Sequence, residues 1–222
     1  MIEEMRKRFM DANVKEANKI QIEKVIKNLE RRNITGHYCE TAAEVSAKVL
    51  SLIDEGSEVS WGGSATLNEI GVKDAVKAGN YKVNDPMDLS GGEDPIELRR
   101  KSLTCDVFLA STNAVTMDGV LVNIDGTGNR VAAMMFGPKK VILIAGINKL
   151  AADEESALRR VKQEACPPNC IRLGKKTPCA VTGECGNCLT PGQTICSYTV
   201  STRFSPEKDR LHVILVNDIL GF

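Results

Sequence analysis

Short, continuously apolar segments alternate with helical segments along most of this sequence, and this alternation constrains the fold most strongly. The clearest apolar segments cover residues 107–110 and 141–145, and residues 211–216 are apolar apart from His212. Apolar runs of this length are typical of strands that are buried on both faces of a parallel sheet. In residues 3–32, by contrast, apolar side chains recur at helical spacing. We therefore predict an α/β fold, a mostly parallel sheet with helices on both faces.

Local signals predict further elements. Thr41 and Glu44 have the spacing of a capping box, which would begin a helix that continues to about residue 53. Residues 121–124 are expected to form a hairpin with the residues that precede Asp118, because Asp-Gly pairs favour tight turns. Residues 153–165 are expected to be helical.

We expect one domain over residues 1–222, since a chain of this length can bury a full core. Residues 1–35 would form an N-terminal helical extension of that domain. Residues 166–196 are rich in Cys, Pro and Gly, and are expected to be an elaboration inserted before the last strand.

Composition excludes several classes of partner. The 29 Lys and Arg residues balance 29 Asp and Glu residues, so no overall basic field would attract nucleic acid. The longest apolar run is far shorter than the roughly 20 residues that a membrane span needs. The first ten residues lack the apolar core of a secretory signal. We therefore expect a cytoplasmic protein with neither a nucleic-acid nor a membrane partner.

Two glycine-rich turns, G-G-S at residues 62–64 and D-G-T-G-N at residues 125–129, are candidates for binding a small anionic ligand. Each follows a predicted strand and begins a helix, where glycines permit close approach and unpaired N–H groups attract anions. Turns at the carboxyl ends of parallel strands face one crevice. The expected ligand-binding residues are Gly62, Gly63, Ser64, Thr112, Asn113, Asn123, Gly126, Thr127, Gly128 and Asn129. The alternative is that these are plain strand-to-helix turns, with Ser64 as an N-cap.

Neither turn has the spacing of a dinucleotide-binding or nucleoside-triphosphate-binding loop, so no nucleotide cofactor is indicated. Asp118 and Asp125 are the candidate catalytic residues, because a carboxylate beside the ligand could act as a general base or orient a hydroxyl. The alternative is that each Asp-Gly pair only makes a turn. His37 and His212 are isolated in the sequence and are expected to be core or surface residues.

Six of the eight cysteines lie between residues 166 and 196, a density that points to metal binding in a reducing compartment. The glycines and prolines of this segment would let it fold around a metal in place of a core. The expected ligands of zinc or an iron–sulfur cluster are Cys179, Cys185, Cys188 and Cys196. Cys166 and Cys170 would be bystanders or spare ligands, and Cys39 and Cys105 buried core thiols. Free thiols, or disulfides formed after purification, are the alternative.

Several of these motifs together resemble the LUD domain, the lactate-utilisation protein family. The resemblance is carried by W-G-G-S at residues 61–64, T-N-A-V-T at 112–116, D-G at 118–119 and N-I-D-G-T-G-N-R-V at 123–131. The cysteine-containing tail resembles that of the short, single-domain members. The resemblance implies a Rossmann-like fold of the NagB/RpiA/CoA-transferase type.

The resemblance also implies a function. The protein would be an accessory or catalytic component of L-lactate (2-hydroxy acid) oxidation to pyruvate, with iron–sulfur partner subunits that remove the electrons. Whether the chain is an enzyme by itself, and whether it forms a homo-oligomer, stays open. The alternatives are a sugar-phosphate isomerase or CoA-transferase-like enzyme on the same fold, or a non-catalytic metal-binding scaffold.

Overall fold

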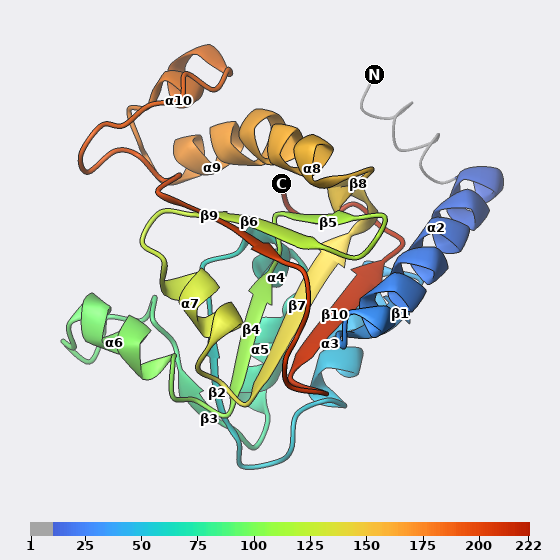
Figure 1. The fold of residues 1–222 in the computed structure, drawn as a ribbon. Helices are drawn as coiled ribbons and strands as arrows, with labels where there is room; N and C mark the ends of the chain where they lie inside the picture. Colours follow the sequence, from blue (N-terminus) through green and yellow to red (C-terminus); the bar gives the residue numbers. More distant parts are fainter. Residues whose placement is uncertain (1–10) are drawn as a thin grey trace.

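The computed structural model describes residues 11–222, and its centre is a six-stranded sheet (Figure 1). The strands of this sheet are β1 (Thr35–Cys39), β2 (Glu58–Trp61), β3 (Lys82–Asn84), β4 (Val107–Ser111), β7 (Lys140–Gly146) and β10 (Leu211–Val216). Their order is β1-β10-β7-β4-β2-β3, and every neighbouring pair is parallel. The predicted mostly parallel sheet is therefore confirmed.

The central strands are apolar throughout because both of their faces are covered. In β7, Val141, Leu143 and Ala145 belong to the core on one face of the sheet, and Ile142 and Ile144 to the core on the other. This alternation follows from the two-residue period of a strand. A helix layer on each face is needed to keep both sets of side chains from water.

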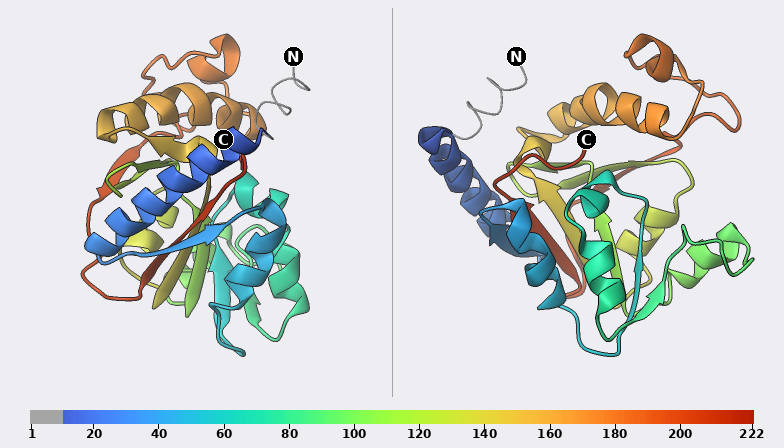
Figure 2. Two further views of the ribbon diagram at one scale, coloured as in Figure 1. Left: turned by 90° about the vertical axis from the view of Figure 1, so that its right-hand side faces the viewer. Right: turned by 180° about the vertical axis from the view of Figure 1, so that it is seen from behind.

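Helices supply these two layers (Figures 1 and 2). One face is covered by α3 (Ala42–Leu50), α4 (Ala65–Glu69) and α5 (Val72–Ala78), and the other by α2 (Ala12–Arg31) and α7 (Asn129–Met135). The short helix α6 (Pro95–Lys101) lies between β3 and β4 in the chain. The predicted N-terminal helix is thus confirmed from Ala12 onward, and its residues 3–10 lie outside the described part. Asp11 caps α2 by accepting the backbone N–H of Asn13 at 2.8 Å.

A second, smaller sheet crosses above the first, and the sequence analysis did not predict it (Figure 1). Its strands are β5 (Ala114–Thr116), β6 (Leu121–Asp125), β8 (Leu150–Ala151) and β9 (Tyr198–Thr202), in the order β8-β5-β6-β9. The hairpin between β5 and β6 is the one predicted around Asp118. Strand β9 pairs with β6 although its own residues are largely exposed, so no local apolar pattern announces it.

A long helical run covers the outer face of the second sheet. It consists of α8 (Glu154–Arg160), the π-helical turn η2 (Val161–Ala165) and α9 (Cys166–Arg172). The prediction ended this helix at residue 165, but it continues through Pro167 and Pro168. Prolines cannot donate the backbone hydrogen bond of a helix interior. A wider π turn lies directly before them, where the backbone hydrogen-bonding pattern already departs from that of an α-helix. After α9 come α10 (Pro178–Thr182) and a loop that leads to β9.

Helix α3 differs from the prediction in the bonding at its start and in the position of its end. The predicted capping box at Thr41 does not form: the Glu44 N–H is bonded to the Thr41 carbonyl, and the Glu44 carboxylate accepts the N–H of Glu40 at 3.0 Å. Helix α3 also ends at Leu50, three residues earlier than expected. Within residues 11–222, no helix combines the length and the apolar character that crossing a membrane requires.

Candidate functional site

A cavity of about 740 Å³ lies where β2, β4 and β7 end. Gly63 and Ser64 line it from the turn after β2, and Ser111 from the end of β4. Lys149 lines it from the 3₁₀ turn η1 (Ile147–Lys149), which directly follows β7. Residues of the long helical run, including Val161, close another side. Ligand crevices of open parallel sheets occur at this edge.

The two glycine-rich turns contribute to this same cavity, as the sequence analysis expected. The predicted residues that line it are Gly63, Ser64, Asn113, Asp125, Gly126, Thr127 and Asn129. Within the described chain, the predicted residues that do not line it are Gly62, Thr112, Asp118, Asn123 and Gly128. The residues of the second group either make hydrogen bonds within the cavity wall, as Asn123 does, or lie away from the cavity.

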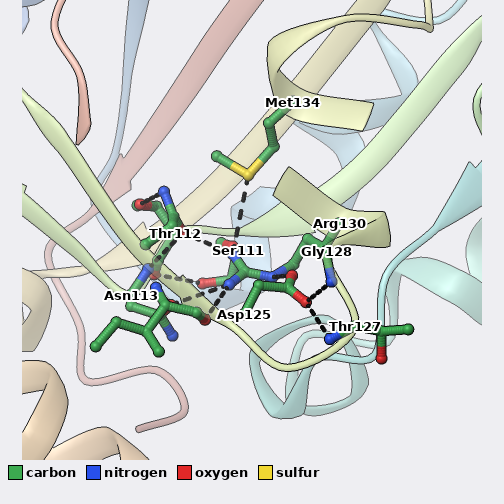
Figure 3. A network of polar contacts seen from close by, with 10 residues as sticks. Ser111, Thr112, Asn113, Asp125, Thr127, Gly128, Arg130 and Met134 are labelled. Carbon is green, nitrogen blue, oxygen red and sulfur yellow. Dashed lines mark hydrogen bonds and ion pairs between the residues drawn. The ribbon is translucent and has the colours of Figure 1, made fainter. Parts of the chain in front are cut away.

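Arg130 is the centre of a buried polar network in the cavity wall (Figure 3). Its guanidinium donates to the Ser111 carbonyl at 3.0 Å, to Asn123 Oδ1 at 2.6 Å and to Asn113 Oδ1 at 3.0 Å. Its Nε lies 3.4 Å from the Asp125 carboxylate. The network joins β4, β6 and α7, so Arg130 and the two asparagines have mainly a scaffolding role.

Asp125 is engaged by its own turn. Its Oδ1 accepts the N–H groups of Thr127 at 3.0 Å and Gly128 at 2.8 Å, while Oδ2 faces Arg130. The turn needs glycine at position 128, where φ is +87° and a Cβ atom would lie 3.1 Å from the Tyr198 ring. Two of the N–H groups that we expected to hold an anion are therefore already bonded to a protein carboxylate.

Asp118 lies in the β5–β6 hairpin turn, away from the cavity lining. It accepts the Thr116 hydroxyl and pairs with Arg32 at the end of α2. The hydrogen bond from Thr116 and the charge of Arg32 lower the pKa of the Asp118 carboxyl. Its side chain is 62% exposed. This placement corresponds to the turn-forming alternative.

Lys149 lines the cavity and was not among the predicted site residues, and the same is true of Arg99, Arg172 and Lys175. Lys149 is only 3% exposed, and its Nζ donates to Thr66 Oγ1 at 3.0 Å and Ser111 Oγ at 2.8 Å. Within residues 11–222 it makes no ion pair. Burial, reinforced by Arg160 and Arg130, lowers the pKa of Lys149 to about 7. A lysine four residues beyond a buried apolar run was the available signal, since such positions lie at the ligand-binding edge of a parallel sheet.

The cavity as a whole is electropositive. Its charged lining residues are Arg99, Asp125, Arg130, Lys149, Arg172 and Lys175. Five of these six are basic, and the one carboxylate is already paired with Arg130. A cavity with this balance of charge favours an anion.

The clustered cysteines lie beside a second cavity, of about 190 Å³, which all six of them line. Cys166 Sγ lies 3.4 Å from Cys196 Sγ, and Cys170 Sγ lies 3.6 Å from Cys179 Sγ. In the part of the chain that is described, no three Cys, His, Asp or Glu side chains are grouped around one ion position. Cys166 and Cys170, expected to be bystanders, thus contact two members of the predicted ligand set.

The remaining cysteines and the histidines are not part of either cavity lining. Cys39 and Cys105 are buried in the core, as predicted. Burial raises the pKa of the Cys105 thiol to about 12. His37 and His212 stack on neighbouring strands, with His37 Nε2 3.0 Å from His212 Nδ1.

Comparison with known proteins agrees with this fold. No curated protein matches the sequence. The crystal structure of a DUF162 family protein from Deinococcus radiodurans is similar, with a TM-score of 0.50 and 13% identity over 91% of this chain and 98% of that chain. At this identity the similarity shows the fold. A family profile described as LUD domain matches residues 22–216. Since that match spans most of the chain, the protein belongs to the LUD domain family.

Proposed function

We propose that the large cavity binds a small carboxylate of the 2-hydroxy or 2-oxo acid class, and that the protein takes part in lactate oxidation. Lys149 carries this proposal, because it is a buried ammonium that faces a cavity and makes no ion pair within residues 11–222. An isolated buried charge is costly, and a ligand carboxylate would compensate it. Family membership makes 2-hydroxy acids the first class to test.

The chemistry available to Lys149 fits such a ligand. With a pKa of about 7, the side chain exists near neutral pH as both the ammonium and the amine. The ammonium would hold the ligand carboxylate. Oxidation of the 2-hydroxyl releases two electrons and two protons, and a redox partner would have to accept them. The electrons would leave through partner subunits, since no flavin or nicotinamide fingerprint is present in the sequence.

A thermal-shift and calorimetry panel tests the proposal. L-lactate and pyruvate should raise the unfolding temperature, by an amount equivalent to about 2.7 kcal/mol at a hundred times Kd. Propionate, which lacks the 2-oxygen, should bind more weakly. The absence of any shift with the 2-hydroxy and 2-oxo acids, under conditions where the protein is folded, would contradict the proposal.

The size of the cavity favours a second candidate, an enzyme that acts on a larger anion such as a sugar phosphate. A volume of about 740 Å³ is ample for a ligand larger than a three-carbon acid. Arg99, Arg172 and Lys175 add positive charge beyond that of Lys149 and could hold a phosphate. Stabilisation by pentose or hexose phosphates but not by 2-hydroxy acids would select this candidate.

A further inference from the structure

The cysteine-lined cavity is built by three separate parts of the chain. Helix α9 contributes Cys166 and Cys170, which are four residues apart and therefore lie on one face of the helix. The chain then folds back over this face twice, placing Cys179 beside Cys170 and Cys196 beside Cys166. Between these two passes, the C-G-N-C segment at residues 185–188 lines the cavity as well.

Apolar packing accounts for only part of this arrangement: Cys166 belongs to an apolar cluster with Val161 and Ala165, and Cys196 packs against it. Buried cysteines can behave as small hydrophobic residues, and that is how Cys39 and Cys105 are used in the core. In the segment between α9 and β9, however, two large apolar side chains are exposed: Val181 is 78% exposed and Leu189 is 90% exposed. All four thiols of the segment line the second cavity, although only Cys179 is buried, Cys188 and Cys196 are half-buried and Cys185 is exposed. A group that binds sulfur would supply the missing stabilisation.

The number and spacing of the thiols favour a group larger than one ion. Structural zinc is held by four ligands at about 2.3 Å, packed closely around a single point. Here six thiols line a cavity of about 190 Å³, which is more ligands and more space than one tetrahedral ion needs. An iron–sulfur cluster has four cysteine ligands attached to different corners, which places the ligands farther apart.

We propose that this cavity holds an iron–sulfur cluster bound by the four thiolates of the segment between α9 and β9, namely Cys179, Cys185, Cys188 and Cys196. Cys166 and Cys170 contact the sulfur atoms of Cys196 and Cys179, and act as positioning residues for those two ligands. Hydrogen bonds to ligating sulfurs tune the reduction potential of such clusters.

The cluster would lie next to the large cavity. Ile124, Cys166 and Ile195 line both cavities, so a single layer of side chains separates them. The proposed cluster does not depend on the identity of the ligand in the large cavity. Its test therefore succeeds or fails independently of the proposed function.

The experiment uses the full chain, purified without oxygen and also reconstituted with ferrous iron, sulfide and a thiol reductant. We expect about four iron and four sulfide per chain, a broad visible absorption band and an electron paramagnetic resonance signal after reduction. The double variant Cys185→Ser/Cys188→Ser should lose the band and the signal. The control Cys105→Ser alters a core thiol outside the cavity and should keep both.

The positioning role is tested separately. Cys166→Ala and Cys170→Ala should keep the iron content but change the reduction potential of the cluster. Circular dichroism of every variant establishes that it is folded. Zinc without colour, or folded protein whose thiols take up neither iron nor sulfide, would overturn the proposal. Loss of the cluster in Cys166→Ala or Cys170→Ala would overturn the ligand assignment.

Discussion

Two basic residues of the large cavity, the half-buried Arg130 and the buried Lys149, have different roles because their surroundings differ. Arg130 faces Asp125 and donates to several protein oxygens, so its hydrogen-bonding capacity is used within the wall. Among residues 11–222, the partners of Lys149 Nζ are the hydroxyls of Thr66 and Ser111. A buried charge that hydroxyls alone satisfy is poorly compensated, which is typical of groups that serve a ligand.

Replacing Lys149 with Met tests this difference, since Met keeps most of the apolar stem and removes the charge. A hydrogen bond to a charged group contributes about 1.5–3 kcal/mol, so carboxylate affinity should fall by about 10- to 100-fold in calorimetry. The free energy of unfolding should not decrease, because a costly buried cation is lost. Lys139→Met, at an 85% exposed position paired with Asp106, is the matched control and should bind as the parent does. Unchanged affinity in Lys149→Met would remove Lys149 from the site.

The same lysine predicts a pH dependence. Burial and the nearby guanidinium groups lower the pKa of Lys149 to about 7, against an ordinary value of about 10.4 in the unfolded chain. Carboxylate affinity should therefore be full below pH 7 and be lost as the pH rises through 7. Between pH 7 and about 10 the unfolded chain binds the extra proton, so stability should rise with pH in the parent relative to Lys149→Met. Urea unfolding at several pH values measures this slope, and parallel curves would contradict the assignment.

At the scale of elements, the turn from β2 into α4 shows how backbone geometry opens the cavity. A Cβ atom on Gly63 would meet no other heavy atom within 4 Å, and the residue does not have a positive φ. A Cβ on Gly62 would instead lie 3.3 Å from the Arg130 side chain. Gly62 is thus needed for packing, whereas Gly63 leaves space at the cavity.

Gly63→Val should therefore fold normally and fail to bind. We expect an unfolding temperature close to that of the parent and a loss of affinity of at least tenfold, because the isopropyl group would occupy ligand space. Gly91→Val is a suitable control, since Gly91 also lacks a positive φ and lies outside the cavity lining. If Gly63→Val binds like the parent, the turn has only a structural role.

The pair of strands β1 and β10 carries a second pH-dependent element. Burial, with smaller contributions from His212 and Lys48, lowers the pKa of His37 to about 4, and burial also lowers that of His212. The unfolded chain then binds more protons between pH 6.5 and 4, so stability is lost as the pH falls through this window. In His37→Gln, the loss measured by urea unfolding should shrink by on the order of 2 kcal/mol. Equal losses in parent and variant would show that the pair is not responsible.

At the scale of the whole molecule, the densely packed central sheet contrasts with the cysteine segment, residues 174–197, which is largely exposed. Strands β7 and β10 are buried between helices on both faces. Helix α10 lies out beyond α9 at the periphery (Figure 1), and the side chains of residues 183–187 are exposed. Exposed backbone with few apolar contacts opens at low free energy.

Hydrogen exchange should separate these two parts. Without metal, amides of residues 174–197 should exchange orders of magnitude faster than those of β7 and β10. Reconstitution with iron and sulfide should slow exchange in residues 174–197 and leave the sheet unchanged. If iron and sulfide slow hydrogen exchange equally in the sheet and in the segment, or in neither, the cysteines do not have a local role.

The sequence by itself determined the layered α/β architecture, because burial and period are local properties. Runs such as residues 141–145 need two covered faces, and helical spacing in α2 provides a covering face. The glycine turns also indicated the correct edge of the sheet, because parallel strands place their carboxyl ends together.

Only the tertiary structure decided which polar groups are already paired. The sequence does not show that Asp125 is bonded to its own turn and to Arg130, that Asp118 pairs with Arg32, or that Lys149 is buried without an ion pair among residues 11–222. Strand β9 and the helix through Pro167 likewise depend on distant neighbours. Local pattern reports which residues are buried, whereas the partner of a buried charge is set by contacts between segments far apart in the chain.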